Sequence, residues 1–138
     1  MKFVRFATLS LAILAVTQAH AQSTGNLVAT PNPLSWSVSG DLTQYGTVSV
    51  VNSGAGFASN LATTLTRSTP LRNGQVALLS DTCNGATLAP GGTCVMHFSF
   101  DPSCPTPANA TYTLTMTSSN ALTLTVPIYA QSKGGGCL

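Results

Sequence analysis

The chain has 138 residues, of which only 6% are charged and 43% are hydrophobic. A formal net charge of +2 on so few ionisable side chains gives no concentrated positive surface for nucleic acid or anionic lipid. The composition therefore argues against nucleic-acid binding, and the length suits one domain with one core.

Residues 1–21 are predicted to be a secretory signal peptide. Lys2 and Arg5 form a positive start, the apolar run FATLSLAILAVT follows, and AHA at residues 19–21 gives a small-x-small cleavage pattern. The apolar run is shorter than the roughly 20 residues that a membrane span needs, so we expect no transmembrane anchor. The exported chain would begin near residue 22 and reach the periplasm, the cell surface or the medium.

Cleavage would change the charge balance, because two of the five cationic side chains lie in the leader. Three cations and three anions then remain in the mature chain: Arg67, Arg72, Lys133, Asp41, Asp81 and Asp101. The mature protein is therefore expected to be neutral.

Alternation of apolar and polar residues recurs along the rest of the chain and predicts short, half-buried β-strands. In chain order these runs are LSWSVS (34–39), GTVSVVN (46–52), NLATTLTR (60–67), GQVALLS (74–80), CVMHFSF (94–100), TYTLTMTSS (111–119) and LTLTVPIYA (122–130). Turn signals such as TPNP, NSGAG, CNG, APGG and SSN separate them. We predict an all-β fold: an Ig-like antiparallel β-sandwich of about seven strands over residues 22–132, followed by a Gly-rich tail at 133–138.

The alternation also predicts which side chains face the interior. In the last run, Leu122 is placed on the interior side, and Pro127 indicates an edge or bulged position. The main predicted interior residues are Leu34, Trp36, Val38, Val48, Val50, Met96, Phe98, Phe100, Leu114 and Leu124.

Four cysteines in an exported chain predict two disulfides, for which three pairings are possible. Cys83 and Cys94 flank a Gly/Pro-rich, hairpin-like connection, which favours local pairing and leaves Cys104 with Cys137. Cys137 lies behind three glycines near the end, so a bridge to another chain is the alternative. The spacings supply neither a zinc knuckle nor a C-x-x-C redox pair, and we expect no metal and no cofactor.

Candidate catalytic residues are few. His97 is the one histidine after the leader, and its place in the alternation directs it to solvent, opposite Met96 and Phe98. A hydrolase would have to combine it with an aspartate and a serine, and no G-x-S-x-G motif is present. We therefore expect no catalytic residue and no enzyme.

Three segments, in this order, carry a family resemblance: PNPLSWSVSG (31–40), YGTVSVVNSGAGFASNL (45–61) and DTCNGATLAPGGTCVMHFSFDP (81–102). They resemble the bacterial Ig-like domains of the choice-of-anchor D type, relatives of the major-sperm-protein and ASPM/SPD-2/Hydin-like sandwiches. The resemblance implies a Cys83–Cys94 bridge and no shared catalytic residues. It also implies a module of the kind that serves as spacer, stalk or adhesive unit in larger exported proteins.

We therefore expect an exported, non-enzymatic Ig-like module that acts in binding, adhesion or structural support at the bacterial envelope. Its partner would be a protein or a second copy, joined through strand edges. The long, uncharged, Thr-rich segments 111–118 and 121–130 are the predicted edges, with Thr123 and Thr125 as positions where lysine would block pairing. The alternatives are a periplasmic chaperone or assembly subunit, a small exported enzyme that uses His97, and a protease inhibitor that presents the loop around Cys104.

Overall fold

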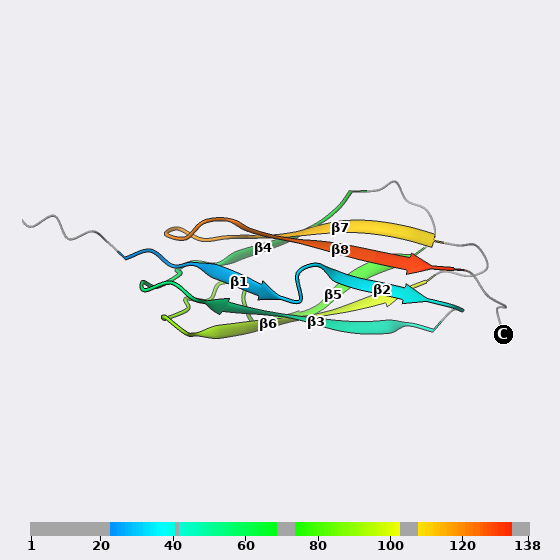
Figure 1. Ribbon diagram of the computed structural model, residues 1–138, viewed down its shortest axis with the longest axis horizontal. Helices are drawn as coiled ribbons and strands as arrows, with labels where there is room; N and C mark the ends of the chain where they lie inside the picture. The colour runs from blue at the N-terminus through cyan, green and yellow to red at the C-terminus, as the bar shows by residue number, and fades with distance from the viewer. Residues whose placement is uncertain (1–22, 41, 69–73, 103–107, 134–138) are drawn as a thin grey trace, which may run out of the picture.

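The computed structural model of the protein describes residues 23–40, 42–68, 74–102 and 108–133 (Figure 1). Over these residues the chain forms eight β-strands and no helix. The strands are β1 (Leu27–Thr30), β2 (Leu34–Val38), β3 (Gln44–Asn52), β4 (Ala62–Arg67), β5 (Gln75–Asp81), β6 (Thr93–Asp101), β7 (Ala108–Thr117) and β8 (Leu124–Ser132).

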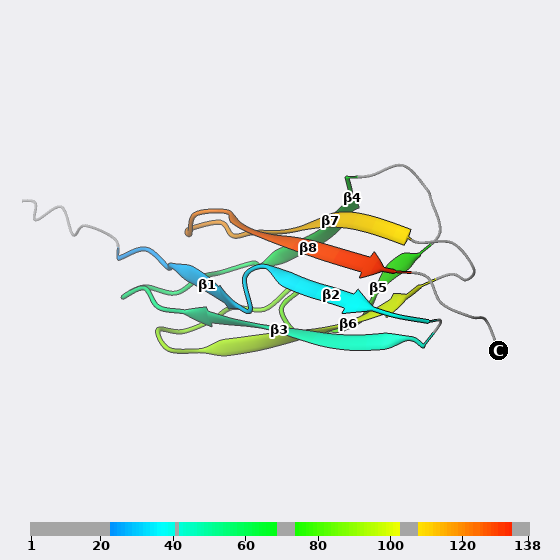
Figure 2. The same cartoon turned by 45° about the vertical axis from the view of Figure 1, so that its right-hand side comes forward.

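The strands form two four-stranded sheets that pack face to face, with orders β1-β3-β6-β5 and β2-β8-β7-β4 (Figures 1 and 2). If the strands are lettered A to G along the chain, with β1 and β2 as two halves of strand A, these orders read ABED and AGFC. This is the arrangement of an Ig constant-type sandwich with part of strand A added to the second sheet. The predicted all-β, Ig-like sandwich is confirmed.

The structure has one strand more than expected, because β1 precedes the first predicted run at 34–39 and was not predicted. Pro31 and Pro33 stand between β1 and β2, and a proline cannot donate a hydrogen bond to a strand ladder. β1 pairs antiparallel with β3, whereas β2 pairs parallel with β8. The chain therefore crosses from one sheet to the other at these prolines.

The core fills the space between the sheets. Of the ten predicted interior residues, seven are buried: Leu34, Val48, Val50, Met96, Phe98, Phe100 and Leu114. The other three are half-buried and pack against the same cluster: Trp36, Val38 and Leu124.

Trp36 closes one margin of the core. Its ring lies 6.0 Å from that of Phe100, and its Nε1–H donates to the carbonyl of Tyr45 at 3.3 Å. A Cβ atom at Gly46 would lie 2.6 Å from the indole ring. Position 46 therefore needs glycine for Trp36 to fit.

The expectation that segments 111–118 and 121–130 are sheet edges is wrong. β7 lies between β8 and β4, and β8 lies between β2 and β7. Thr125 is paired with Thr115 inside the sheet, so lysine there would not mark an edge. Alternation reports the two faces of a strand, but it says nothing of its lateral neighbours.

The expected edge position of Pro127 is found locally, although β8 as a whole is an interior strand. Pro127 is paired with Thr113 of β7, but the first β8 residue paired with β2 is Ile128. The proline thus lies where the β2 ladder has not yet begun, and its missing N–H interrupts no pair of that ladder.

The four true edge strands are short or blunted. β1 has four residues and β2 has five. In β5 the register shifts between Leu78 and Ser80, and the N–H of Val76 donates to the hydroxyl of Tyr112 at 3.3 Å. In β4 the N–H of Thr63 donates to a side chain at 3.4 Å. Short length, bulges and capped groups are the features that keep an edge from pairing with another strand.

Asn52, at the end of β3, is a fully buried polar residue whose side chain makes four hydrogen bonds. Its Oδ1 accepts from two backbone N–H groups at 2.9 and 3.1 Å, and its Nδ2 donates to two backbone carbonyls at 2.7 and 2.9 Å. The backbone groups belong to Asn26, Gly54, Gly56 and Leu88. Every polar atom of the amide is therefore used to hold three separate segments together.

The segments around Asn52 approach so closely that two positions need glycine. A Cβ atom at Gly56 would lie 1.8 Å from the carbonyl oxygen of Ser23, and one at Gly54 would lie 2.5 Å from the backbone nitrogen of Asn26. Because these neighbours are backbone atoms, no side-chain movement could make room. The sequence NSGAG thus predicts a turn correctly. The structure adds that this turn packs directly against the backbone of residues 23–26.

Replacing Asn52 with alanine should lower the free energy of unfolding by about 3 kcal/mol, because it removes four hydrogen bonds of a buried amide. The N–H groups of Asn26 and Gly54 and the carbonyl of Gly56 lose this partner, whereas the carbonyl of Leu88 still accepts from the N–H of Ala58. Urea unfolding of the mature chain measures this. Ser49→Ala, on the exposed face of the same strand, is the matched control and should change stability by less than about 0.5 kcal/mol. Equal effects of the two substitutions would contradict the role given to Asn52.

Candidate functional site

A disulfide joins Cys83 to Cys94 and closes the loop from β5 to β6. The carboxylate of Asp81 organises this loop: it accepts from the N–H of Cys83 at 2.7 Å and of Asn84 at 3.0 Å, and from the hydroxyl of Thr63. The bridge lies within one sheet, unlike the bridge between strands B and F of antibody domains. Asp81 therefore has a structural role in a cross-linked loop.

The predicted Cys104–Cys137 bridge lies outside the described residues and stays a prediction. The same holds for Asp41 and Arg72, for the signal peptide and for the Gly-rich tail beyond residue 133.

Replacing Cys83 and Cys94 together with alanine should reduce the free energy of unfolding by about 3 kcal/mol, because the unfolded chain regains the freedom of the closed loop. Alanine is chosen because both sulfur positions are buried and serine would place hydroxyls there. Urea unfolding of this variant is compared with Thr87→Ala, an exposed position in the same loop. A loss below about 1 kcal/mol would show that the bridge is dispensable.

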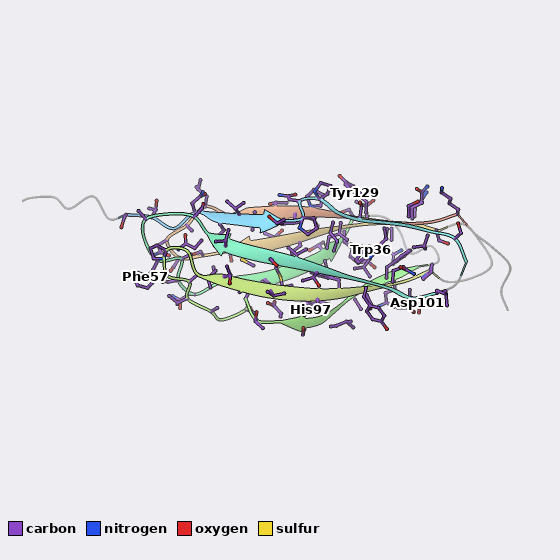
Figure 3. All side chains as sticks on the ribbon, turned by 60° about the horizontal axis from the view of Figure 1, so that its bottom comes forward. Trp36, Phe57, His97, Asp101 and Tyr129 are labelled. Carbon is purple, nitrogen blue, oxygen red and sulfur yellow. A yellow bond between two sulfur atoms is a disulfide. The ribbon has the colours of Figure 1, made fainter. Side chains whose placement is uncertain are left out.

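His97 is exposed on the outer face of β6, where its Nδ1 lies 3.0 Å from the hydroxyl of Thr47 (Figure 3). Asp101 is four residues further along the same strand, which corresponds to about 13 Å at strand spacing. Asp81 is held in the disulfide loop. The described part of the chain thus brings no aspartate beside His97 in the way that a hydrolase triad requires.

The titratable side chains Arg67 and Tyr112 contact each other across β4 and β7 of one sheet. The guanidinium of Arg67 lies 5.4 Å from the ring centre of Tyr112, and Nη1 donates to its hydroxyl at 3.3 Å. Within the described ranges, no three His, Cys, Asp or Glu side chains are grouped so that they could hold a metal ion. The described residues also contain no helix long and apolar enough to cross a membrane.

Two surfaces are candidate functional sites. The first lies at the end of the sandwich where β3 ends and β8 begins. Here the β3–β4 and β7–β8 loops are joined through Ser59. Its N–H donates to Oδ1 of Asn120 at 2.8 Å, and its carbonyl accepts from Oγ of Ser118 at 2.9 Å and from N–H of Ser119 at 3.1 Å. The corresponding loops form part of the antigen-binding end of antibody variable domains. The hydrogen bonds of Ser59 fix the positions of the two loops relative to each other.

These joined loops present two large apolar side chains, Phe57 at 56% and Leu122 at 82% exposure (Figure 3 for Phe57). Hollows of about 310 and 440 Å³ lie beside them and share Thr24 and Asn120 in their walls. We call Phe57, Leu122 and these hollows the apolar tip. The expected interior position of Leu122 is wrong, because β8 begins only at Leu124 and the preceding turn carries Leu122 outward.

The second surface is the outer face of the β2-β8-β7-β4 sheet, which we call the threonine face. Its outward residues are Ser35, Ser37, Ala62, Thr64, Thr66, Asn109, Thr111, Thr113, Thr115, Thr117, Thr125, Pro127, Tyr129 and Gln131. None of these residues carries a charge. A hollow of about 330 Å³ lies on this face between β7 and β8, beside Tyr129.

The sequence alone did not indicate either surface. The sequence places four aromatic residues on separate predicted strands and so predicts no common platform for a sugar: Trp36, Tyr45, Tyr112 and Tyr129. In the structure these side chains also lie apart. Tyr112 is buried, Trp36 packs on the core, and Tyr45 and Tyr129 lie on different sheets. Only strand pairing shows which polar residues surround Tyr129.

No protein-family model matches the sequence, and neither does any curated protein. Among solved structures, the secreted serine protease VesC from Vibrio cholerae is similar with a TM-score of 0.57 and 16% identity, over 82% of this chain and 23% of the protease. VesB from the same organism gives 0.51 and 17%, over 77% and 31%. The ASH/PapD-like domain 7 of human CEP192 gives 0.50 and 12%, over 94% of this chain and 100% of that domain.

This chain thus spans less than a third of either protease chain, and it spans the whole of the CEP192 domain. At these identities the similarity shows the fold alone. The fold is that of an Ig-like β-sandwich domain. The disulfide fits an exported protein.

Proposed function

We propose that this chain is an exported, non-enzymatic Ig-like module of the choice-of-anchor D type, which acts by contact with a protein partner at the bacterial envelope. The observation that carries the proposal is the apolar tip, where Phe57 and Leu122 project from loops that are held together by hydrogen bonds. Isolated apolar side chains are common on protein surfaces. Two at one loop end, each beside a hollow, suit a contact surface better.

The side chains of the apolar tip indicate what kind of partner surface it would bind. The residues that line the two hollows are all uncharged: Ser23, Thr24, Ala55, Gly56, Phe57, Asn120, Ala121 and Leu122. A charged partner would lose hydration there and gain no opposite charge. The expected partner is therefore a protein that offers an uncharged, partly apolar surface. Because the loops are already ordered, binding has little conformational entropy to lose.

Strand addition is the competing mode of contact. β1, β2 and β5 are short, interrupted or capped, which favours the tip over an edge. The open side of β4 is where an added strand would pair, and Thr66→Lys on that strand is the substitution that would interfere with it.

Replacing Phe57 and Leu122 together with aspartate should reduce partner capture at least tenfold, because each change removes an apolar contact and buries a charge in the interface. The matched control is Leu42→Asp, which is 73% exposed and precedes β3 at its other end. Capture from native envelope and medium, followed by mass spectrometry, compares the wild type with both variants. Size-exclusion chromatography shows whether the captured partner is a second copy.

Two outcomes would overturn the role of the tip. One is capture that persists in the tip variant but is lost in Thr66→Lys, which would assign the contact to strand addition. The other is an equal loss in Leu42→Asp, which would indicate a nonspecific effect of added charge. The captured protein also decides between roles: a pilus or secretion subunit would support an assembly function, and an exported protease would support inhibition.

Replacing His97 with alanine should leave both stability and capture unchanged, since the ring is exposed and its hydrogen bond to the hydroxyl of Thr47 lies on the surface. The change in unfolding free energy should stay within about 0.5 kcal/mol. A hydrolytic activity of the purified mature chain that disappears in His97→Ala would instead make the protein an enzyme.

A further inference from the structure

The threonine face differs from an ordinary soluble surface in having no charged residue among the outward positions of its four strands. A typical surface is about 25–35% Lys, Arg, Glu and Asp. Hydroxyl groups take their place, and they lie in register across the sheet. Thr125 of β8 is opposite Thr115 of β7, and Thr115 is opposite Thr64 of β4.

Tyr129 stands in this face at 47% exposure, on the other sheet from His97 (Figure 3). In register, it is flanked by Ser35 of β2 and Thr111 of β7. The next outward position along β8 is Gln131, which lies opposite Asn109. The hollow of about 330 Å³ is thus lined by one aromatic ring, one hydroxyl residue and two amides, from Tyr129, Thr111, Asn109 and Gln131.

These groups select for one kind of ligand. Hydroxyl and amide groups each donate and accept hydrogen bonds, so they match a partner that does the same at many points. The exposed ring offers an apolar surface for stacking. Within the four strands an ionic ligand would find no opposite charge on this face, and Lys133 follows directly after the end of β8.

From this arrangement we propose that the threonine face binds a neutral polysaccharide, with a sugar ring stacked on Tyr129 and its hydroxyls bonded to Asn109, Thr111 and Gln131. The inference extends the proposed function, because it assigns a contact module a second surface and a glycan ligand. A protein partner is less well matched to this face. Protein interfaces concentrate several large apolar side chains at their centre, and here Tyr129 is the one large ring among small polar residues.

The test titrates the mature chain with one soluble polysaccharide at a time in isothermal titration calorimetry, which needs no net charge on the protein. The neutral probes are a β-glucan, an α-glucan and a mannan, and polygalacturonate is the acidic comparator. The wild type should bind at least one neutral polymer, with little change between low and moderate salt, because the contact involves no charges. Binding to polygalacturonate alone, or to no polymer, would overturn the proposal.

Substitutions then assign the binding to the site. Tyr129→Ala should weaken binding to the polymer that the wild type binds by at least tenfold, and Gln131→Ala should weaken it several-fold. Tyr129→Phe should keep most of the binding because the ring remains. The matched control is Tyr45→Ala, a tyrosine that is 72% exposed on the other sheet, and it should bind as the wild type does. Undiminished binding by Tyr129→Ala, or an equal loss in Tyr45→Ala, would overturn the assignment.

The tip variant separates this proposal from the proposed function. Phe57→Asp with Leu122→Asp should lose protein capture and still bind the polysaccharide, whereas Tyr129→Ala should do the reverse. Loss of protein capture in Tyr129→Ala without any glycan binding would make the threonine face a protein interface and overturn the glycan proposal. The protein-contact proposal and the glycan proposal can thus be overturned independently of each other.

Discussion

The side-chain amide of Asn52 joins stretches of backbone that are far apart in the sequence, and the rest of the architecture is arranged around it. It reaches Asn26 ahead of β1, the turn at 54–56, and Leu88 in the disulfide loop. The main chain of Asn52 adds hydrogen bonds to Gly91 and Gly92. Burying an amide is unfavourable unless all its hydrogen bonds are made, so these segments must be positioned together.

This constraint links the interior to the apolar tip. Around Asn52, the close approach of Gly54 and Gly56 to residues 23–26 fixes the base of the loop that carries Phe57. The disulfide and Asp81 fix the neighbouring loop by covalent and polar contacts. The tip is therefore supported from below by packed backbone, while the threonine face is supported by the regular pairing of β8 and β7.

The extent of sequence-based prediction follows from the range of the interactions. Alternation is local, so the runs around Met96 and Leu114 predict strands, and export with paired cysteines predicts a bridge at Cys83 and Cys94. Lateral neighbours depend on pairing between distant segments, which is why the interior position of β7 and β8 could not be read from their threonines. The divided first strand is foreshadowed only by the prolines of TPNP, which mark a break but not a change of sheet.

The candidate site was less predictable than the fold for the same reason. Leu122 continues the alternation of β8 in the sequence, yet β8 begins only at Leu124. The surroundings of Tyr129 come from β2 and β7, which lie tens of residues apart in the chain. NSG before a loop signals a turn, but nothing local reveals that Asn52 is buried.

The crossing of strand A between the sheets has a mechanical consequence. β2 and β8 run in the same direction, and the first and last described residues leave from opposite ends of the sandwich (Figures 1 and 2). A pull between these ends would first load β1 against β3 and, after β1 detaches, would draw β2 back along β8. The five register pairs from Leu34–Ile128 to Val38–Ser132 would then bear the load together in shear. Hydrogen bonds loaded in parallel must break together, whereas those of a peeled hairpin break one at a time. The parallel pairing of β2 and β8 therefore resists extension of the domain between its two ends.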